Sequence, residues 1–466
     1  MSTSIKKNFL YNVFYQLLVI IIPLITTPYI SRVLGAYEIG RYSYSNSVAQ
    51  YFVLFVMLGL NNYGNRSIAT IRDDKEKLSK TFWNIYGMQF ICGVIVICLY
   101  IAYNIYISND LMLSILFGIN VVAAVLDINW LFFGLEMFQF NMIRNCIVRT
   151  ITTICIFVFV KDAGDVAIYC LIMVLGTLIS NVVLWPFVIK TIPFYKISLK
   201  EIAIHIKPNL LLFLTVVAVS VYKIMDKIML GYMTNKTQVG FYESSERVIV
   251  VPVAFVTALG TVMLPRITNM MEHNDSGIDI VMKKSMKLAM FTSSSLCFGI
   301  MSVAKEFVPL FYGDGFQPCV NLFYILMPSC IFLAYGNVIR TQFLLPNKKD
   351  KIYVQSAFLG AIINLIINYV LIPILGATGA AIGTLFTELS VCIYQVWKVR
   401  SELNIKPLLK CALPFVFSGM IMFCLVFFID FGLDNKIVEL LMNIILGATI
   451  YLSISYIIER RNRDVK

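Results

Sequence analysis

Long apolar runs alternate with short polar segments along almost the whole chain. About 20 consecutive apolar residues are needed for a helix to cross the hydrocarbon core of a bilayer. By that measure the pattern predicts an all-α polytopic membrane protein with about 14 transmembrane helices. The spans are expected at residues 8–34, 43–64, 81–107, 111–135, 146–160, 166–189, 208–233, 240–264, 286–312, 318–345, 352–373, 377–398, 409–429 and 436–458.

The polar segments between these spans differ in charge, and the difference predicts an orientation. With the N-terminus placed inside, most of the 38 lysines and arginines fall in segments on the cytoplasmic side, as the positive-inside rule requires. A single miscounted span would invert every later segment and destroy this bias. We therefore expect a multi-pass protein of the cytoplasmic (inner) membrane with both termini in the cytoplasm.

Composition supports the membrane assignment and excludes several functions. The chain is 59% hydrophobic and 14% charged, against about 45–50% and about 25% in soluble domains. The net charge of +12 follows from the basic inner segments, so no nucleic-acid partner is expected. The 11 cysteines show no CxxC spacing, and the two histidines, His205 and His273, are far apart. We expect no metal site, no cofactor and, because the outer segments are short, no enzyme.

The two halves of the chain share an internal pattern. LGAYEIGRYSYSNS at residues 34–47 is echoed by LGYMTNKTQVGFYESSE at residues 230–246. Gly40 and Gly240 are each followed two residues later by a tyrosine and 26 residues later by an arginine. Such a fixed spacing predicts a duplicated unit, which is typical of transporters. We expect two pseudo-symmetric six-helix lobes at residues 1–190 and 191–400, then two additional helices and a cytoplasmic tail at 401–466.

Four stretches resemble a known family. They are ISRVLGAYEIGRY at 30–42, DINWLFFGLEMFQ at 127–139, DKIMLGYMTNKTQVGFYESSERV at 226–248 and NLIINYVLIPILGATGAAIGTLFTE at 364–388. They look like the bacterial polysaccharide transporters, the O-antigen and capsule repeat-unit flippases of the multidrug/oligosaccharidyl-lipid/polysaccharide superfamily. The resemblance covers the first twelve predicted spans; the last two match only in number and hydrophobicity.

The resemblance implies a V-shaped two-lobed bundle with a central cavity. It would move an undecaprenyl-diphosphate-linked oligosaccharide from the inner to the outer leaflet by alternating access, for surface polysaccharide assembly and without covalent chemistry. The implied partners are this polyprenyl diphosphate-linked glycan and membrane lipids, and they could include the polysaccharide polymerase machinery. The alternative is an ion-coupled multidrug/cation antiporter of the same superfamily, for which twelve spans and a carboxylate-rich cavity would be typical.

Cations outside the loop pattern are the first candidates for a binding site, because ionisable residues inside a membrane are costly. Five lie in the outer halves of predicted spans or near their outer ends: Arg32, Arg41, Lys223, Lys227 and Arg247. With Asp226 they are predicted to bind the diphosphate, the arginines bidentately. Two simpler interpretations stay open: Lys223, Asp226 and Lys227 pair along one helix face, or Arg41 and Arg247 snorkel to outer headgroups.

Acidic and amide side chains inside spans complete the candidates. Glu388 falls near the middle of its span, where a lone carboxylate costs about 2.5 kcal/mol or more, so it is a candidate for ion coupling. Asp127 is a second candidate, or only a capping residue. Asn46 and Gln50 lie in the polar part of the second span and are predicted to bind sugar, although hydrogen bonding between helices explains them equally well.

Overall fold

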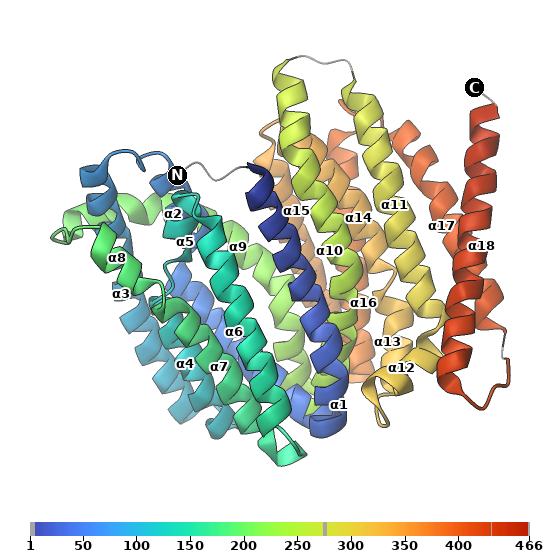
Figure 1. The fold of residues 1–466 in the computed structure, drawn as a ribbon, viewed down its shortest axis with the longest axis horizontal. Coiled ribbons are helices and arrows are strands. Elements are labelled where there is room, and N and C mark those ends of the chain that lie inside the picture. The colour runs from blue at the N-terminus through green and yellow to red at the C-terminus, as the bar shows by residue number, and fades with distance from the viewer. Residues whose placement is uncertain (1–4, 274–276, 430, 465–466) are drawn as a thin grey trace. The chain divides into compact units, whose positions relative to one another are not determined.

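The computed structural model describes residues 5–273, 277–429 and 431–464; residues 1–4 of the predicted first lobe and 465–466 of the predicted tail lie outside this description. All regular elements within these ranges are helical (Figure 1), without a strand. The first helices are α1 (Ile5–Met57), α2 (Leu60–Ala69), α3 (Lys75–Tyr106), α4 (Leu111–Val125), α5 (Asn129–Gly134), α6 (Phe138–Phe159), α7 (Val166–Val182), α8 (Trp185–Thr191) and α9 (Leu199–Met233). They are followed by α10 (Lys236–Glu272), α11 (Ile278–Ser302), α12 (Ala304–Tyr312), α13 (Pro318–Leu326), α14 (Ser329–Ile339), α15 (Asp350–Leu375), α16 (Ala377–Val399), α17 (Ile405–Phe427) and α18 (Lys436–Asp464). Short turns η1 (Ala163–Asp165) and η2 (Arg340–Leu344) complete the elements.

The all-helical membrane fold predicted from the apolar runs is confirmed, but the number of spans is not. Ten helices or merged helix pairs of the described ranges are long and apolar enough to cross a membrane, or up to twelve if each of two bent pairs is one span. One bent pair joins Leu199–Leu214 to Val216–Met233 at 47° within α9, and the other joins α11 to α12 at 78°. The total of fourteen therefore stays a prediction.

Helix α1 holds the first predicted span and most of the second, which continues into α2, and it breaks between the two spans. Gly35 has φ 72° and ψ 172°, outside the helical region. A positive φ is strained for residues with a Cβ, so glycine suits this position. The chain returns to helix at once, which makes the expected polar loop at 35–42 a helical segment. The non-helical backbone inside α1 is thus confined to Gly35.

The chain divides into two compact units, Met1–Ile228 and Met229–Lys466. Each has its own core: residues such as Phe82, Trp130 and Phe132 are buried in the first, and Met286 and Ile339 in the second. In the first unit α4, α6 and α7 run side by side (Figure 1). The partition falls inside α9, whereas the sequence places the lobe boundary at residue 190, so the predicted three-part division stays a prediction.

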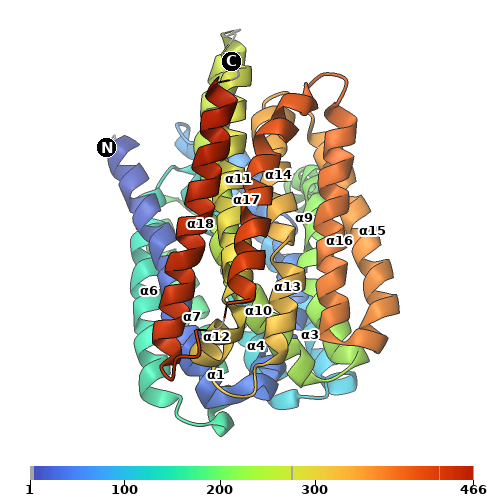
Figure 2. The ribbon, with the colours of Figure 1, turned by 90° about the vertical axis from the view of Figure 1, so that its right-hand side faces the viewer.

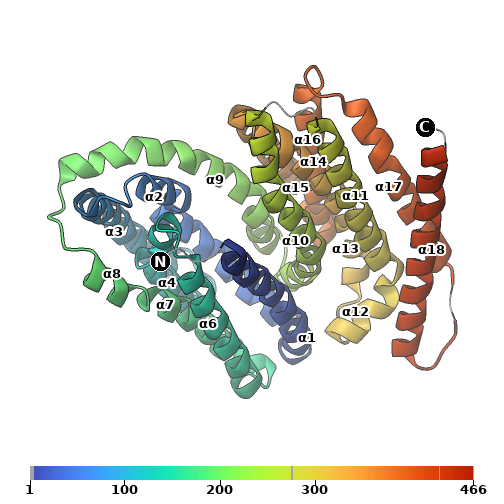
Figure 3. The same cartoon turned by 45° about the horizontal axis from the view of Figure 1, so that its top comes forward.

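Polar contacts hold the first half of α9 to α2 and α3, which explains why α9 belongs mainly to the first unit. Figure 3 shows its long curved course past these two helices. The Glu201 carboxylate accepts a hydrogen bond of 2.6 Å from the Asn84 amide and pairs with Lys80 at 2.5 Å. The Tyr63 hydroxyl lies 2.7 Å from Nδ1 of His205.

Close helix packing in the second unit is provided by small residues. Helices α15 and α16 lie side by side (Figure 2). A Cβ on Gly379 would come within 2.5 Å of the Leu371 carbonyl oxygen, and one on Gly360 within 2.7 Å of Val391. Gly379 lies in the small-residue run GATGAAIG at 376–383, which therefore allows these backbones to approach closely.

A substitution at Gly93 tests whether close approach of neighbouring helices is required for stability. A Cβ at Gly93 would lie 2.5 Å from Cγ2 of Val125. We expect Gly93→Leu to lower the free energy of unfolding by about 1–3 kcal/mol through overpacking, measured by thermal unfolding of the purified protein in detergent. Gly299→Leu is the matched control, because a Cβ there meets only the flexible end of Met422 at 3.9 Å. Equal stability of the two variants would contradict this packing.

Candidate functional site

The repeated Gly-x-Tyr pattern lies at equivalent places in the two units and serves packing. Tyr42 of α1 is 8% exposed, and its ring centroid lies 5.2 Å from that of Phe117 and 4.7 Å from that of Tyr169. Tyr242 of α10 is 1% exposed, and its hydroxyl lies 2.8 Å from that of Thr384. The sequence pattern that indicates the duplication therefore marks two buried helix contacts.

Arg41 is held within the first unit by two carboxylates. Its Nε donates to Asp110 Oδ2 at 2.8 Å, and its Nη1 pairs with Glu38 at 2.8 Å. Asp110 also accepts the backbone N–H of Leu113 and so caps α4. Arg41 thus joins α1 to the start of α4, and these contacts favour a structural part for it over snorkelling. Its predicted part in substrate binding stays a prediction.

Arg247 is likewise engaged, and it is the one predicted cation of the set that belongs to the second unit. Its Nε lies 2.9 Å from Oε1 of Glu243, one turn earlier on α10. Both side chains are mostly shielded from solvent, so this pair is not a surface contact. Lys227 lies in the first unit, as do Arg32 and Arg41. The predicted part of these cations in substrate binding stays a prediction.

Three charged side chains of the second half of α9 differ in burial. Asp226 is 1% exposed, Lys227 is half-buried and Lys223 is exposed. Arg32 on α1 is exposed, and its Nη1 donates to the carbonyl of Pro28 at 3.2 Å. Helix α9 therefore carries a buried carboxylate with one lysine at the next position and another one turn before it. Their predicted part in binding a diphosphate stays a prediction.

The predicted amide ligands on α1 lie near α9. Asn46 and Gln50 are both half-buried. The next residue, Tyr51, donates its hydroxyl proton to the carbonyl of Ser220 at 3.3 Å, which ties this part of α1 to α9. The role of the two amides in sugar binding stays a prediction.

Asp127 belongs to a hydrogen-bonded cluster that shapes the chain between α4 and α5. Its Oδ1 accepts from the backbone N–H of Asn129 at 2.9 Å and from that side-chain amide at 2.6 Å. Asn129 in turn accepts from Arg144 at 2.9 Å. The Gln89 amide donates to the carbonyl oxygens of Ala124 and Asp127, both at 2.8 Å. This geometry favours the capping interpretation of Asp127; ion coupling stays untested.

Glu388 lies half-buried on α16 next to a polar cluster that the sequence reasoning missed as a site. Asn364 and Asn368 of α15 are 0% exposed, and Asn368 donates to Asn364 Oδ1 at 3.2 Å. Thr384 stands one turn before Glu388 and contacts Tyr242. The signal was present in the sequence, because NLIINYV places two asparagines four residues apart inside an apolar run.

The Gln89 cluster can be tested by stability. Gln89 is 0% exposed and also accepts the indole N–H of Trp130 at 3.1 Å. Gln89→Leu leaves these buried groups unpaired, so we expect a loss of about 1–3 kcal/mol in unfolding free energy, measured by thermal unfolding in detergent. Trp130→Phe removes the indole donor and also empties part of a fully buried site, so it should lower the stability as well. A Gln89→Leu variant as stable as the wild-type chain would show that the cluster is not needed.

Comparisons with known proteins agree with these features. A family model described as polysaccharide biosynthesis protein matches residues 5–271. A putative O-antigen transporter of Escherichia coli (strain K12) is 23% identical over 404 residues, covering 86% of this chain and 97% of that protein. A putative O-antigen transporter of Shigella dysenteriae is 22% identical over 407 residues, covering 85% and 100%.

Solved structures extend the likeness to the fold. The lipid II flippase MurJ in an inward closed conformation superposes with a TM-score of 0.78 at 16% identity, over 97% of this chain and 99% of that chain. At this identity the likeness speaks for the fold alone. The family model covers more than half of the sequence and confirms the resemblance noted in its motifs. This multi-pass membrane protein belongs to the polysaccharide biosynthesis protein family.

Proposed function

We propose that this protein is a flippase that moves an undecaprenyl-diphosphate-linked oligosaccharide repeat unit from the inner to the outer leaflet for O-antigen or capsule assembly. The observation that carries the proposal is the charged segment in the second half of α9, where Lys223 and Lys227 lie within one turn of the buried Asp226 in an apolar helix, while α1 of the same unit carries the exposed Arg32. Membership of the polysaccharide biosynthesis protein family and two relatives named putative O-antigen transporters support it.

The chemistry of the substrate fits these residues. A diphosphate carries negative charge into a medium where an unpaired ion is costly, and guanidinium and ammonium groups offset that cost by charge-assisted hydrogen bonds. Arginine can bind two phosphate oxygens at once, whereas lysine acts as a point charge. The glycan would be bound by amides such as Asn46 and Gln50. No covalent step is needed, so the protein would act as a transporter.

Two units with separate cores suit alternating access. Rocking of one lobe against the other exposes a site first to one side of the membrane and then to the other. Because each unit has its own buried core, each can move as a body, with α9 as the connection. The basic segments favour the cytoplasmic membrane with both termini inside.

Measurement of glycan export tests the proposed role of the cations. We expect Arg32→Ala or Lys227→Ala to abolish glycan export at normal protein level, because the diphosphate loses its counter-charge inside the membrane. Inner-to-outer transfer of lipid-linked glycan in vesicles provides the measurement. Lys190→Ala is the control, because Lys190 is exposed at the end of α8. Full export by both variants would refute a diphosphate site at these residues.

Glu388 tests ion coupling. We expect Glu388→Gln to lose proton- or sodium-dependence of transport while lipid-linked glycan still binds, because the amide keeps the shape but cannot ionise. Transfer in vesicles is compared with and without an imposed ion gradient. Glu402→Gln serves as the control, since Glu402 pairs with Lys349 outside the predicted spans. An unchanged ion dependence in Glu388→Gln would remove this residue from the coupling route.

A further inference from the structure

An open apolar groove runs along the first unit between α1, α3 and α9. Three adjoining hollows of about 620, 110 and 370 Å³ form it. Leu210 lines the first two hollows, and Leu58 and Cys92 line the second and third. The lining is therefore continuous from Lys207 at one end to Leu99 at the other. We call it the α1–α3–α9 groove.

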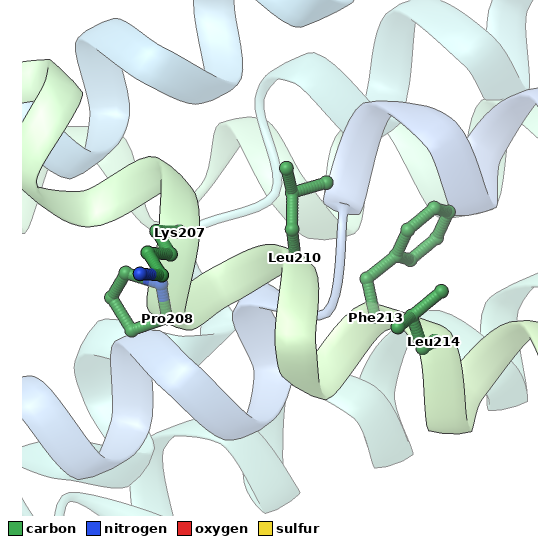
Figure 4. Close-up of a pocket in the computed structure, with 5 residues that line it drawn as sticks. All are labelled: Lys207, Pro208, Leu210, Phe213 and Leu214. Atoms are coloured by element: carbon green, nitrogen blue, oxygen red, sulfur yellow. The ribbon is translucent and has the colours of Figure 1, made fainter.

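The walls of this groove are almost entirely hydrocarbon. Phe55 of α1, Ile95 and Leu99 of α3 and Leu214 of α9 line it and are 48%, 56%, 58% and 53% exposed. Figure 4 shows the α9 side, with Lys207 at one end of the row of lining side chains and Leu214 at the other. Apolar surface of this kind inside a membrane is complementary to a hydrocarbon chain.

The length of the groove matches one leaflet. Its α3 side runs from Met88 to Leu99, which is about 17 Å at a rise of about 1.5 Å per residue. The hydrocarbon core of a bilayer is about 30 Å thick, so one leaflet contributes about half of that. A chain anchored by a headgroup at one surface would therefore fill the groove without crossing the midplane.

The polar end of the groove offers cations for a headgroup. Lys207 is exposed there, and the exposed Lys200 lies two turns earlier on α9. Asn209 borders the second hollow but is 0% exposed, so the surface that a ligand would meet at this depth is apolar. The two lysines can therefore hold an anionic headgroup beside an apolar groove.

We propose that the α1–α3–α9 groove binds one acyl chain of an anionic glycerophospholipid. The ammonium group of Lys207 contacts the phosphate, and the chain lies along α3 as far as Leu99. A phospholipid fits better than a polyprenyl tail, because the tail would exceed the length of one leaflet. The site does not depend on which molecule the protein transports.

A bound lipid here would act on α9. The first hollow reaches Leu214, next to the 47° bend between Leu214 and Val216, and Phe55 already packs against Phe213 with ring centroids 5.4 Å apart. An acyl chain between α1, α3 and α9 would add contacts at this point and stabilise the bent form of the helix.

Native mass spectrometry of the full chain tests the proposal, with phosphatidylglycerol and phosphatidylcholine as probes. We expect preferential retention of phosphatidylglycerol, and about fivefold weaker retention in Lys207→Ala because one cation near the headgroup is lost. Cys92→Trp would fill the groove and remove this lipid. Cys98→Trp is the matched control, since Cys98 is exposed on the same helix and lines none of the three hollows.

A second measurement keeps the test valid if Cys92→Trp fails to fold. Alkylation of Cys92 in the unmodified chain, read by peptide mass spectrometry, should slow when phosphatidylglycerol is added, while alkylation of Cys98 should not. Equal lipid retention in Cys92→Trp and Cys98→Trp would overturn the proposal. So would equal retention of the two phospholipids, or protection of Cys92 by undecaprenyl phosphate but not by phosphatidylglycerol, which would assign the groove to a polyprenyl tail.

Discussion

Because the hydrocarbon core of a membrane offers no hydrogen-bond partner, the backbone N–H and C=O groups placed there must be satisfied by the protein itself, and much of the structure follows from this constraint. It explains why the regular elements of the described chain are helices. It also explains Gln89, whose buried amide takes up the carbonyl groups left where α4 ends, at Ala124 and Asp127. The amide of Asn181 and the indole of Trp185 donate to two further carbonyl groups there, those of Ala123 and Leu126. Side chains thus satisfy the non-helical backbone between α4 and α5.

The same constraint decides which partners the charged residues need. Arg41 joins two elements through Glu38 and Asp110, and Arg247 pairs with Glu243 on its own helix. These contacts stabilise the units in which they lie, whatever else the two arginines bind. The α9 segment around Asp226 differs. A fully buried carboxylate lies there close to a half-buried lysine, Lys227, and an exposed one, Lys223. Because of this difference in environment, the proposed transport site is placed at α9 and Arg32.

Helix α9 therefore takes part in both the proposed transport site and the proposed lipid site. Its first half is held to α2 and α3 through Glu201 and His205, its middle lines the α1–α3–α9 groove, and its second half carries the candidate diphosphate ligands. Any motion of one unit against the other must pass through this helix, since the partition between the units lies within it. A lipid seated beside its bend would then influence the flexibility of the connection without touching the transported molecule.

The sequence alone determined what depends on local composition and spacing. Apolar runs predicted helices because a helix satisfies its own backbone within lipid, the pattern of spans placed a break between the first two of them, and the repeated Gly-x-Tyr spacing predicted a duplication. Tertiary structure decided the partners: Asp110 for Arg41 across 69 positions, Gln89 for the α4 end, and Thr384 for Tyr242. Hydrophobicity sets the depth of a helix in the membrane, but its rotation and its neighbours depend on packing between distant segments. For that reason the candidate residues could be named from the sequence, whereas their environments could not.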